Sequence, residues 1–106
     1  MKLDAIIVED EETSRDILKN YLKKYCPNVS VLGEASNIDE ALVLIRQNDL
    51  DLVFLDVEMP YGNAFDLLEK VGEHTFETVF VTAYNPFNIN KSVYETFLIQ
   101  VWYTLK

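Results

Sequence analysis

The segment Asp51-Leu52-Val53-Phe54-Leu55-Asp56 places four consecutive apolar residues between two aspartates. These apolar residues do not alternate with polar ones, and an unbroken apolar run is typical of a strand that is buried on both faces of a parallel sheet. We therefore predict a central strand over residues 52–55. Asp56 then stands at the carboxyl end of that strand.

Strand-like and helix-like segments alternate on both sides of this run. Such alternation predicts an α/β fold in which parallel strands are joined by helical crossovers. Five strands and four helices are expected. The strands are residues 5–8, 29–35, 52–55, 78–81 and 101–105, and the fourth helix covers residues 87–97.

The other three helices are recognised by apolar residues at helical spacing. In the first helix these residues are Ile17, Leu18, Tyr21, Leu22 and Tyr25. Asn37 is the predicted N-cap of the second helix, because Glu40 stands three residues later and can complete a capping box. The third helix is expected to direct Phe65, Leu68 and Val71 toward the core.

Bulk properties limit the class of protein. The 106 residues suffice for one domain with one core, and 49% of them are apolar. No apolar run approaches the roughly 20 residues that cross a bilayer, and the N-terminus lacks the features of a signal peptide, so we expect a cytoplasmic protein that does not enter membranes. The net charge of −9 opposes direct binding of nucleic acid.

Polar residues follow the predicted strands at their carboxyl ends, where doubly wound sheets form their binding crevice. They are Glu9 and Asp10 after the first strand, Asp56 and Glu58 after the third, Thr82 after the fourth and Lys106 after the fifth. Taken singly, acids at 9–12 suit any helix N-terminus, and Asp56 could be an ordinary loop carboxylate. Agreement at four strand ends favours a functional site.

Three of these residues are carboxylates, and they come together if the first and third strands are neighbours in the sheet. Glu9, Asp10 and Asp56 would then repel one another unless a cation balanced them. A site of this kind suits Mg²⁺, which also shares the phosphates of substrates. Asp56 at a rigid strand end is thus a candidate nucleophile for a phosphoryl group, with Thr82 and Lys106 as nearby donors.

Four segments resemble the receiver domain of two-component response regulators. They are Ile6-Ile7-Val8-Glu9-Asp10-Glu11, residues 51–60, residues 80–84 and Tyr103-Thr104-Leu105-Lys106. The resemblance covers nearly the whole chain and implies a flavodoxin-like, five-stranded parallel sheet of order 2-1-3-4-5 with helices on both faces. Residues 1–106 would form one receiver domain that ends after the fifth strand, with the family's last helix missing.

The resemblance also implies how the acidic residues act. Asp56 would accept a phosphoryl group from a sensor histidine kinase. Asp10, Asp56 and the backbone carbonyl of Glu58 would bind Mg²⁺, and Glu9 would support the ion through water. Lys106 would pair with the phosphoryl group.

Two further residues would pass on the phosphorylated state. Thr82 would be the switch hydroxyl that moves toward the phosphate, and Tyr103 would be the aromatic residue that reports this movement at the surface. The residues around Ala83-Tyr84 look like the subgroup that carries a LytTR-type DNA-binding output domain, which would lie beyond this chain. Because the chain ends at Lys106, an apolar patch around the last strand is expected to be exposed and to favour pairing of two chains.

The predicted function is a phosphorylation-dependent signalling switch that modifies itself without turning over a metabolite. One alternative is a receiver-like interaction domain that is never phosphorylated. Another is an aspartyl-phosphate hydrolase of the haloacid dehalogenase type, which also uses a strand-end aspartate and Mg²⁺. That type needs a second aspartate two residues after the first, where this chain has Glu58, and a substrate cap for which the chain is too short.

Overall fold

The computed structural model describes residues 2–56 and 64–81. Strands and helices alternate through these residues, as the sequence predicts. The elements are β1 (Leu3–Val8), α1 (Glu12–Tyr25), β2 (Val29–Ala35), α2 (Ile38–Gln47), β3 (Leu52–Asp56), α3 (Ala64–Val71) and β4 (Glu77–Val81). The fifth strand and the fourth helix expected at residues 101–105 and 87–97 lie outside the described residues.

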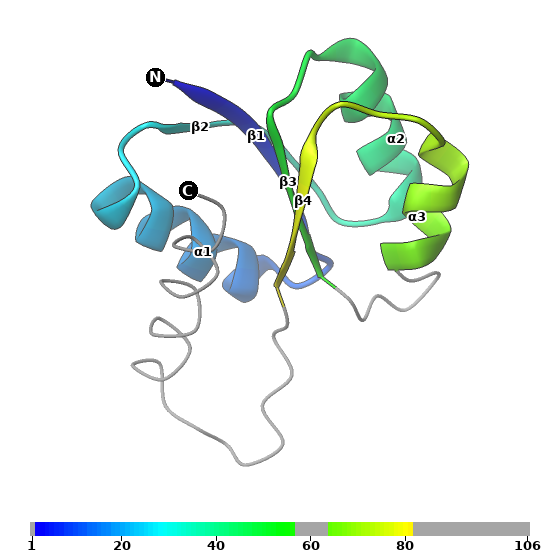
Figure 1. Ribbon diagram of the computed structural model, residues 1–106. Coiled ribbons are helices and arrows are strands. Elements are labelled where there is room, and N and C mark those ends of the chain that lie inside the picture. The colour runs from blue at the N-terminus through cyan, green and yellow to red at the C-terminus, as the bar shows by residue number, and fades with distance from the viewer. Residues whose placement is uncertain (1, 57–63, 82–106) are drawn as a thin grey trace.

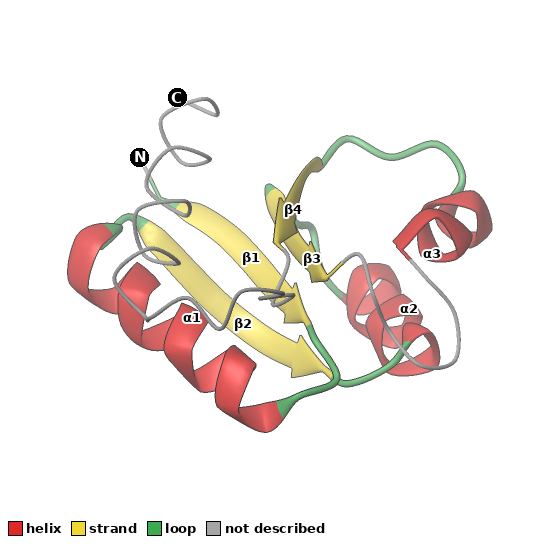
Figure 2. Ribbon diagram, turned by 90° about the horizontal axis from the view of Figure 1, so that it is seen from below, coloured by secondary structure: helices red, strands yellow, loops and turns green. Residues whose placement is uncertain are grey.

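The four strands form a parallel sheet of order β2-β1-β3-β4 (Figure 1). β3 pairs with β1 on one side and with β4 on the other, and all five of its residues are buried. The predicted central strand and the first four positions of the order 2-1-3-4-5 are therefore confirmed. Figure 2 shows α1 on one face of this sheet and α2 with α3 on the other.

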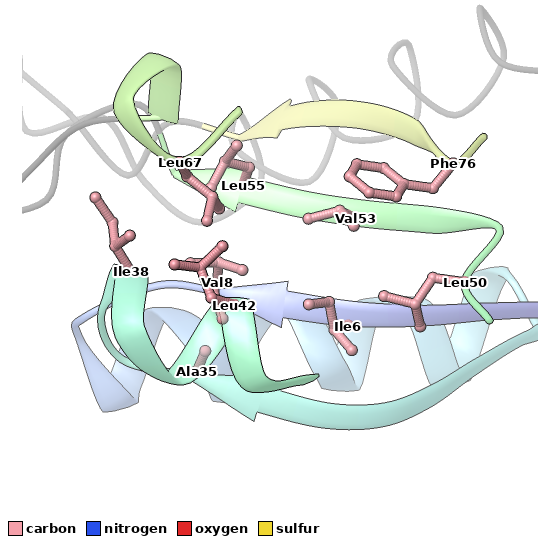
Figure 3. Close-up of a cluster of buried hydrophobic side chains, with 11 residues drawn as sticks. Ile6, Val8, Ala35, Ile38, Leu42, Leu50, Val53, Leu55, Leu67 and Phe76 are labelled. Carbon is pink, nitrogen blue, oxygen red and sulfur yellow. The ribbon is translucent and has the colours of Figure 1, made fainter. Parts of the chain in front are cut away.

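Each face of the sheet has its own apolar core because successive strand residues point to opposite faces. On β1, Ile6 and Val8 belong to the cluster under α2 and α3, whereas Ala5 and Ile7 belong to the cluster under α1. Figure 3 shows the first cluster, in which side chains of β1 and β3 pack with Ile38 and Leu42 of α2 and Leu67 of α3. The two clusters fix the sheet so that its carboxyl edge presents the polar residues that follow the strands.

Two predicted core residues are exposed in the structure. Tyr25 is the last residue of α1 and is 49% exposed, while the next residue, Cys26, is buried. Phe65 is 63% exposed, and Leu67 is the residue of α3 that is completely buried. Side chains two residues apart in an α-helix point in directions that differ by about 200°, so a helix that buries Leu67 turns Phe65 outward. Leu68 and Val71 pack against the core as expected.

The predicted N-cap of α2 is confirmed. The side-chain oxygen of Asn37 accepts a hydrogen bond of 2.9 Å from the backbone N–H of Glu40. The Glu40 carboxylate reaches one residue further back than a simple capping box requires and accepts hydrogen bonds from the backbone N–H and the hydroxyl of Ser36. These bonds hold the pKa of Glu40 below its usual range.

β2 carries an irregularity where it pairs with β1. Ala5 pairs with Val31 but Ile6 pairs with Gly33, so Leu32 is an extra residue in β2. Beside it, α2 comes close to the backbone: a Cβ atom on Gly33 would lie 3.0 Å from a methyl carbon of Leu44.

None of the described helices combines the length and the apolar character that a membrane span requires.

Candidate functional site

Glu9 and Asp56 are brought together by the register of β1 and β3. Val8 pairs with Leu55, so the residues that follow them, Glu9 and Asp56, stand beside each other at the carboxyl edge of the sheet. Both are buried, with 6% and 4% of their surface exposed, and they are the buried charged residues of the described chain. A buried charge is costly unless another group compensates it, so this pair marks a site with a specific chemistry.

Asp10 completes the site from the solvent side. It is exposed, and one carboxylate oxygen from each of Glu9, Asp10 and Asp56 lies within 4.8 Å of the others. The prediction that these three carboxylates converge is therefore confirmed. Glu58, Thr82, Tyr103 and Lys106, which were predicted to join or serve the site, lie outside the described residues, and their placement stays a prediction.

Glu9 is held in place at three of its atoms. Its backbone N–H donates to the carbonyl oxygen of Ala35 at 2.9 Å, and its Oε1 accepts a hydrogen bond of 3.0 Å from the backbone N–H of Glu11. Its own carbonyl oxygen accepts a hydrogen bond of 2.7 Å from Nη1 of Arg15. Because of these contacts the loop that follows β1 presents its acids in a defined direction.

Burial raises the pKa of Glu9 from its ordinary 4.5 to about 9. A hydrogen bond with Asp56 and the negative charge of Asp56 act in the same direction, whereas the hydrogen bond from Glu11 lowers the pKa. Around neutral pH, Glu9 therefore keeps its proton when no cation is bound. A divalent cation would supply the positive charge that the proton otherwise provides.

The donor set fits a hard divalent cation. All three groups are carboxylates, two are fixed by strand ends, and the exposed third leaves one side open to water and to a phosphate. Mg²⁺ prefers such sites, in which a few carboxylates leave room for water and for a substrate phosphate. The residues of the structure therefore match the metal that the sequence indicates.

The sequence did not single out Arg15, although it contacts Glu9 directly. Arg15 is the fourth residue of α1, and a long side chain in that position can reach back over the loop that precedes the helix, but this position alone does not say which atom it contacts. Its contact with Glu9 depends on the angle at which α1 leaves β1. That angle is a property of the packed helix, and no local pattern reveals it.

The parallel sheet, with acids converging where β1 and β3 end, defines a doubly wound domain with a candidate cation site at its carboxyl edge. The family model described as "Response regulator receiver domain" matches residues 5–96. The chain therefore belongs to the receiver domains of response regulators, as its resemblance implied.

Relatives of known sequence agree with this family. An "Uncharacterized response regulatory protein" of Vibrio cholerae is 38% identical over 86 residues, which are 80% of this chain and 36% of that protein. The "Sensory transduction protein LytT" of Bacillus anthracis is 34% identical over 87 residues, which are 80% of this chain and 35% of that protein. The chain thus spans little more than a third of the length of these relatives.

Solved structures share the fold at low sequence identity. The receiver domain of AraT, a response regulator from Geobacillus stearothermophilus, has a TM-score of 0.73 and 20% identity, with 99% of this chain and 96% of that chain covered. The Salmonella typhimurium response regulator RcsB has a TM-score of 0.78 and 19% identity, with 98% and 60% covered. At these identities the similarity shows the fold alone.

Proposed function

We propose that this receiver domain is a phosphorylation-dependent switch in which Asp56 accepts a phosphoryl group from a sensor histidine kinase in a reaction that requires Mg²⁺. The observation that carries the proposal is the burial of Asp56 at the end of β3 with the carboxylates of Glu9 and Asp10 close by. An acid in an ordinary loop would be exposed and would not need compensation by other groups.

In the proposed reaction, a carboxylate oxygen of Asp56 attacks the phosphorus atom of the phosphohistidine, and the bond from phosphorus to the histidine nitrogen breaks. The product is an acyl phosphate on Asp56. Bound Mg²⁺ supplies positive charge that balances the phosphoryl oxygens. Asp10, Asp56 and the backbone carbonyl of Glu58 would hold the ion, and Glu9 would support it through water.

Residues of the undescribed part of the chain complete the proposed switch. Lys106 pairs with the phosphoryl group, and the hydroxyl of Thr82 moves toward it. Tyr103 follows that movement and changes the surface that a partner contacts. β4 supports this proposal for Thr82, because Val81, the last residue of the strand, pairs with Asp56 at this edge of the sheet.

We place the output of the switch in a DNA-binding domain of the LytTR type, outside residues 1–106. The length of the relatives supports this, since the chain matches only 35% of LytT from Bacillus anthracis. The domain itself acts in the cytoplasm as a regulator that turns over no metabolite.

The test compares phosphorylation of two variants with the wild type. The chain is incubated with a small phosphodonor and Mg²⁺, and intact mass is measured. We expect one phosphoryl group on the wild type and on Asp51→Asn, and none on Asp56→Asn. Asp51 is a matched control because it lies just before β3, at the opposite end of that strand, where its carboxylate accepts a hydrogen bond from the backbone N–H of Asp4. Equal labelling of Asp56→Asn, or no labelling of the wild type, would overturn the proposal.

A further inference from the structure

Arg15 connects the acidic loop after β1 to the neighbouring strand β2. Its Nη1 donates a hydrogen bond of 2.7 Å to the backbone carbonyl oxygen of Glu9, and its Nε lies 3.3 Å from Oε1 of Glu34. The Arg15 side chain is only 17% exposed. One guanidinium group therefore holds a backbone atom of the candidate cation site and a carboxylate of β2 at the same time.

Glu34 is itself oriented by a second basic side chain, that of Lys19. Its Oε2 accepts a hydrogen bond of 3.0 Å from Nζ of Lys19, one turn further along α1. Each oxygen of the Glu34 carboxylate therefore contacts a different basic residue of α1. Two anchored ends define the plane of the Arg15 guanidinium better than a single exposed ion pair would.

The carbonyl that Arg15 contacts belongs to the peptide unit that joins Glu9 to Asp10. The orientation of this peptide unit sets the direction in which the Asp10 side chain leaves the backbone. The other contacts of Glu9 act on its N–H and on its carboxylate, through Ala35 and Glu11. Among these described contacts of Glu9, the one from Arg15 acts on the peptide unit between the two acids.

Loss of the guanidinium would leave the Glu9 carbonyl oxygen without this donor at the rim of the buried site. A carbonyl in that position turns toward water to regain a hydrogen bond. The turn rotates the peptide unit and carries the Asp10 carboxylate out of the position that lies within 4.8 Å of Glu9 and Asp56. The three carboxylates would then no longer converge on one point.

We infer that Arg15, oriented by Glu34, is a positioning residue for the divalent cation site: it fixes the peptide unit between Glu9 and Asp10 so that both carboxylates point toward Asp56. This inference rests on the proposed function, because it assumes that these carboxylates bind the cation. Arg15 itself donates to a backbone oxygen and contributes no ligand atom.

Cation affinity measured by titration calorimetry with Mg²⁺ tests the inference. Arg15→Met should raise the dissociation constant by about tenfold or more, the usual effect of losing a group that orients metal ligands. Arg15→Lys should fall between Arg15→Met and the wild type, because an ammonium group can donate to Glu9 but cannot engage Glu34 through a second nitrogen. Arg46→Met, which removes the same charge from the last turn of α2, should leave the affinity unchanged.

A double-mutant cycle separates positioning from a general loss of stability. Glu34→Gln alone should weaken Mg²⁺ binding, but it should cause no further weakening in the Arg15→Met background, because Glu34 acts through Arg15. Amide hydrogen exchange in chelator should show faster exchange at Glu11, whose N–H donates to the Glu9 carboxylate, in Arg15→Met while amides of β3 stay protected. That local change is not expected of a variant that is only less stable.

The outcomes are distinct. If Arg15→Met binds Mg²⁺ with the wild-type dissociation constant, the inference is overturned while the proposed function stays intact. The same holds if the conservative variants Arg15→Lys and Glu34→Gln both bind as the wild type does. If Glu34→Gln raises the dissociation constant by the same factor in the wild type and in Arg15→Met, Glu34 does not act through Arg15. A wild-type chain that binds no Mg²⁺ would overturn the proposed function and, with it, this inference.

Discussion

Glu9 and Asp56 stand side by side at the carboxyl ends of β1 and β3, and both are almost completely removed from solvent. Two buried acids in contact cannot both be ionised without a compensating charge. A proton on Glu9, hydrogen-bonded to Asp56, provides one solution, and a divalent cation provides another. The site therefore has two states of charge, one that holds a proton and one that holds a cation.

Mg²⁺ is expected to stabilise the chain against unfolding. A ligand that binds only the folded state at a concentration 100 times its dissociation constant adds about 2.7 kcal/mol to the free energy of unfolding. Thermal unfolding followed by circular dichroism should show a higher midpoint in excess Mg²⁺ than in chelator. Asp56→Asn should lose most of this increase, whereas Asp51→Asn should retain it. A midpoint that does not respond to Mg²⁺ would contradict the cation site.

In chelator, the stability of the chain is expected to fall as pH rises from about 5 to about 8. The pKa of Glu9 is raised to about 9 in the folded chain, from an ordinary value of 4.5 that it regains on unfolding. Between these pH values the folded chain binds more protons than the unfolded chain. The contribution of Glu9 to the free energy of unfolding is therefore complete at low pH and is lost toward pH 9. One pKa unit corresponds to about 1.4 kcal/mol, and we expect a loss of at least that size.

The control for this pH dependence is Glu9→Gln. Glutamine keeps the shape and the acceptor oxygen of the side chain but cannot ionise. Denaturant unfolding at several pH values should therefore show a smaller decrease for Glu9→Gln than for the wild type. Parallel curves for the two proteins would mean that the pH dependence comes from other groups.

The sequence predicted most of the fold because its signals are local. The unbroken apolar run of β3 and the N-cap at Asn37 each depend on neighbouring residues, and both are confirmed. The convergence of Glu9, Asp10 and Asp56 also followed, because parallel strands that are adjacent in the sheet end at one edge.

The errors concern how a helix turns against the sheet. Phe65 is as apolar as Leu67, so hydrophobicity alone does not say which of them is buried. The contact of Arg15 with Glu9 likewise depends on the path of the backbone between β1 and α1. Such features result from tertiary packing, and the residues around each position carry no distinct pattern for them.

Gly33→Ala is expected to destabilise the chain by about 1 kcal/mol, the lower end of the cost of overpacking. The added Cβ would lie 3.0 Å from a methyl carbon of Leu44, so that α2 or the Leu44 side chain must shift. In a Leu44→Ala background the same substitution meets no such methyl group and should cost less. Denaturant unfolding of the four proteins gives the coupling energy, and strictly additive costs would show that the two positions do not interfere.

Substitutions at Leu67 and Phe65 test which face of α3 is buried. Leu67 is fully enclosed in the cluster of Figure 3, and Leu67→Ala is expected to cost about 2–5 kcal/mol, the range for a leucine removed from a packed core. Phe65 is 63% exposed and touches the ring of Phe80 at a centroid distance of 5.9 Å, so Phe65→Ala should cost about 1 kcal/mol or less. Chemical denaturation of both variants measures the difference. If Phe65→Ala were the more damaging change, α3 would have to be rotated to the orientation that the sequence pattern predicted, and Leu67 would leave the core.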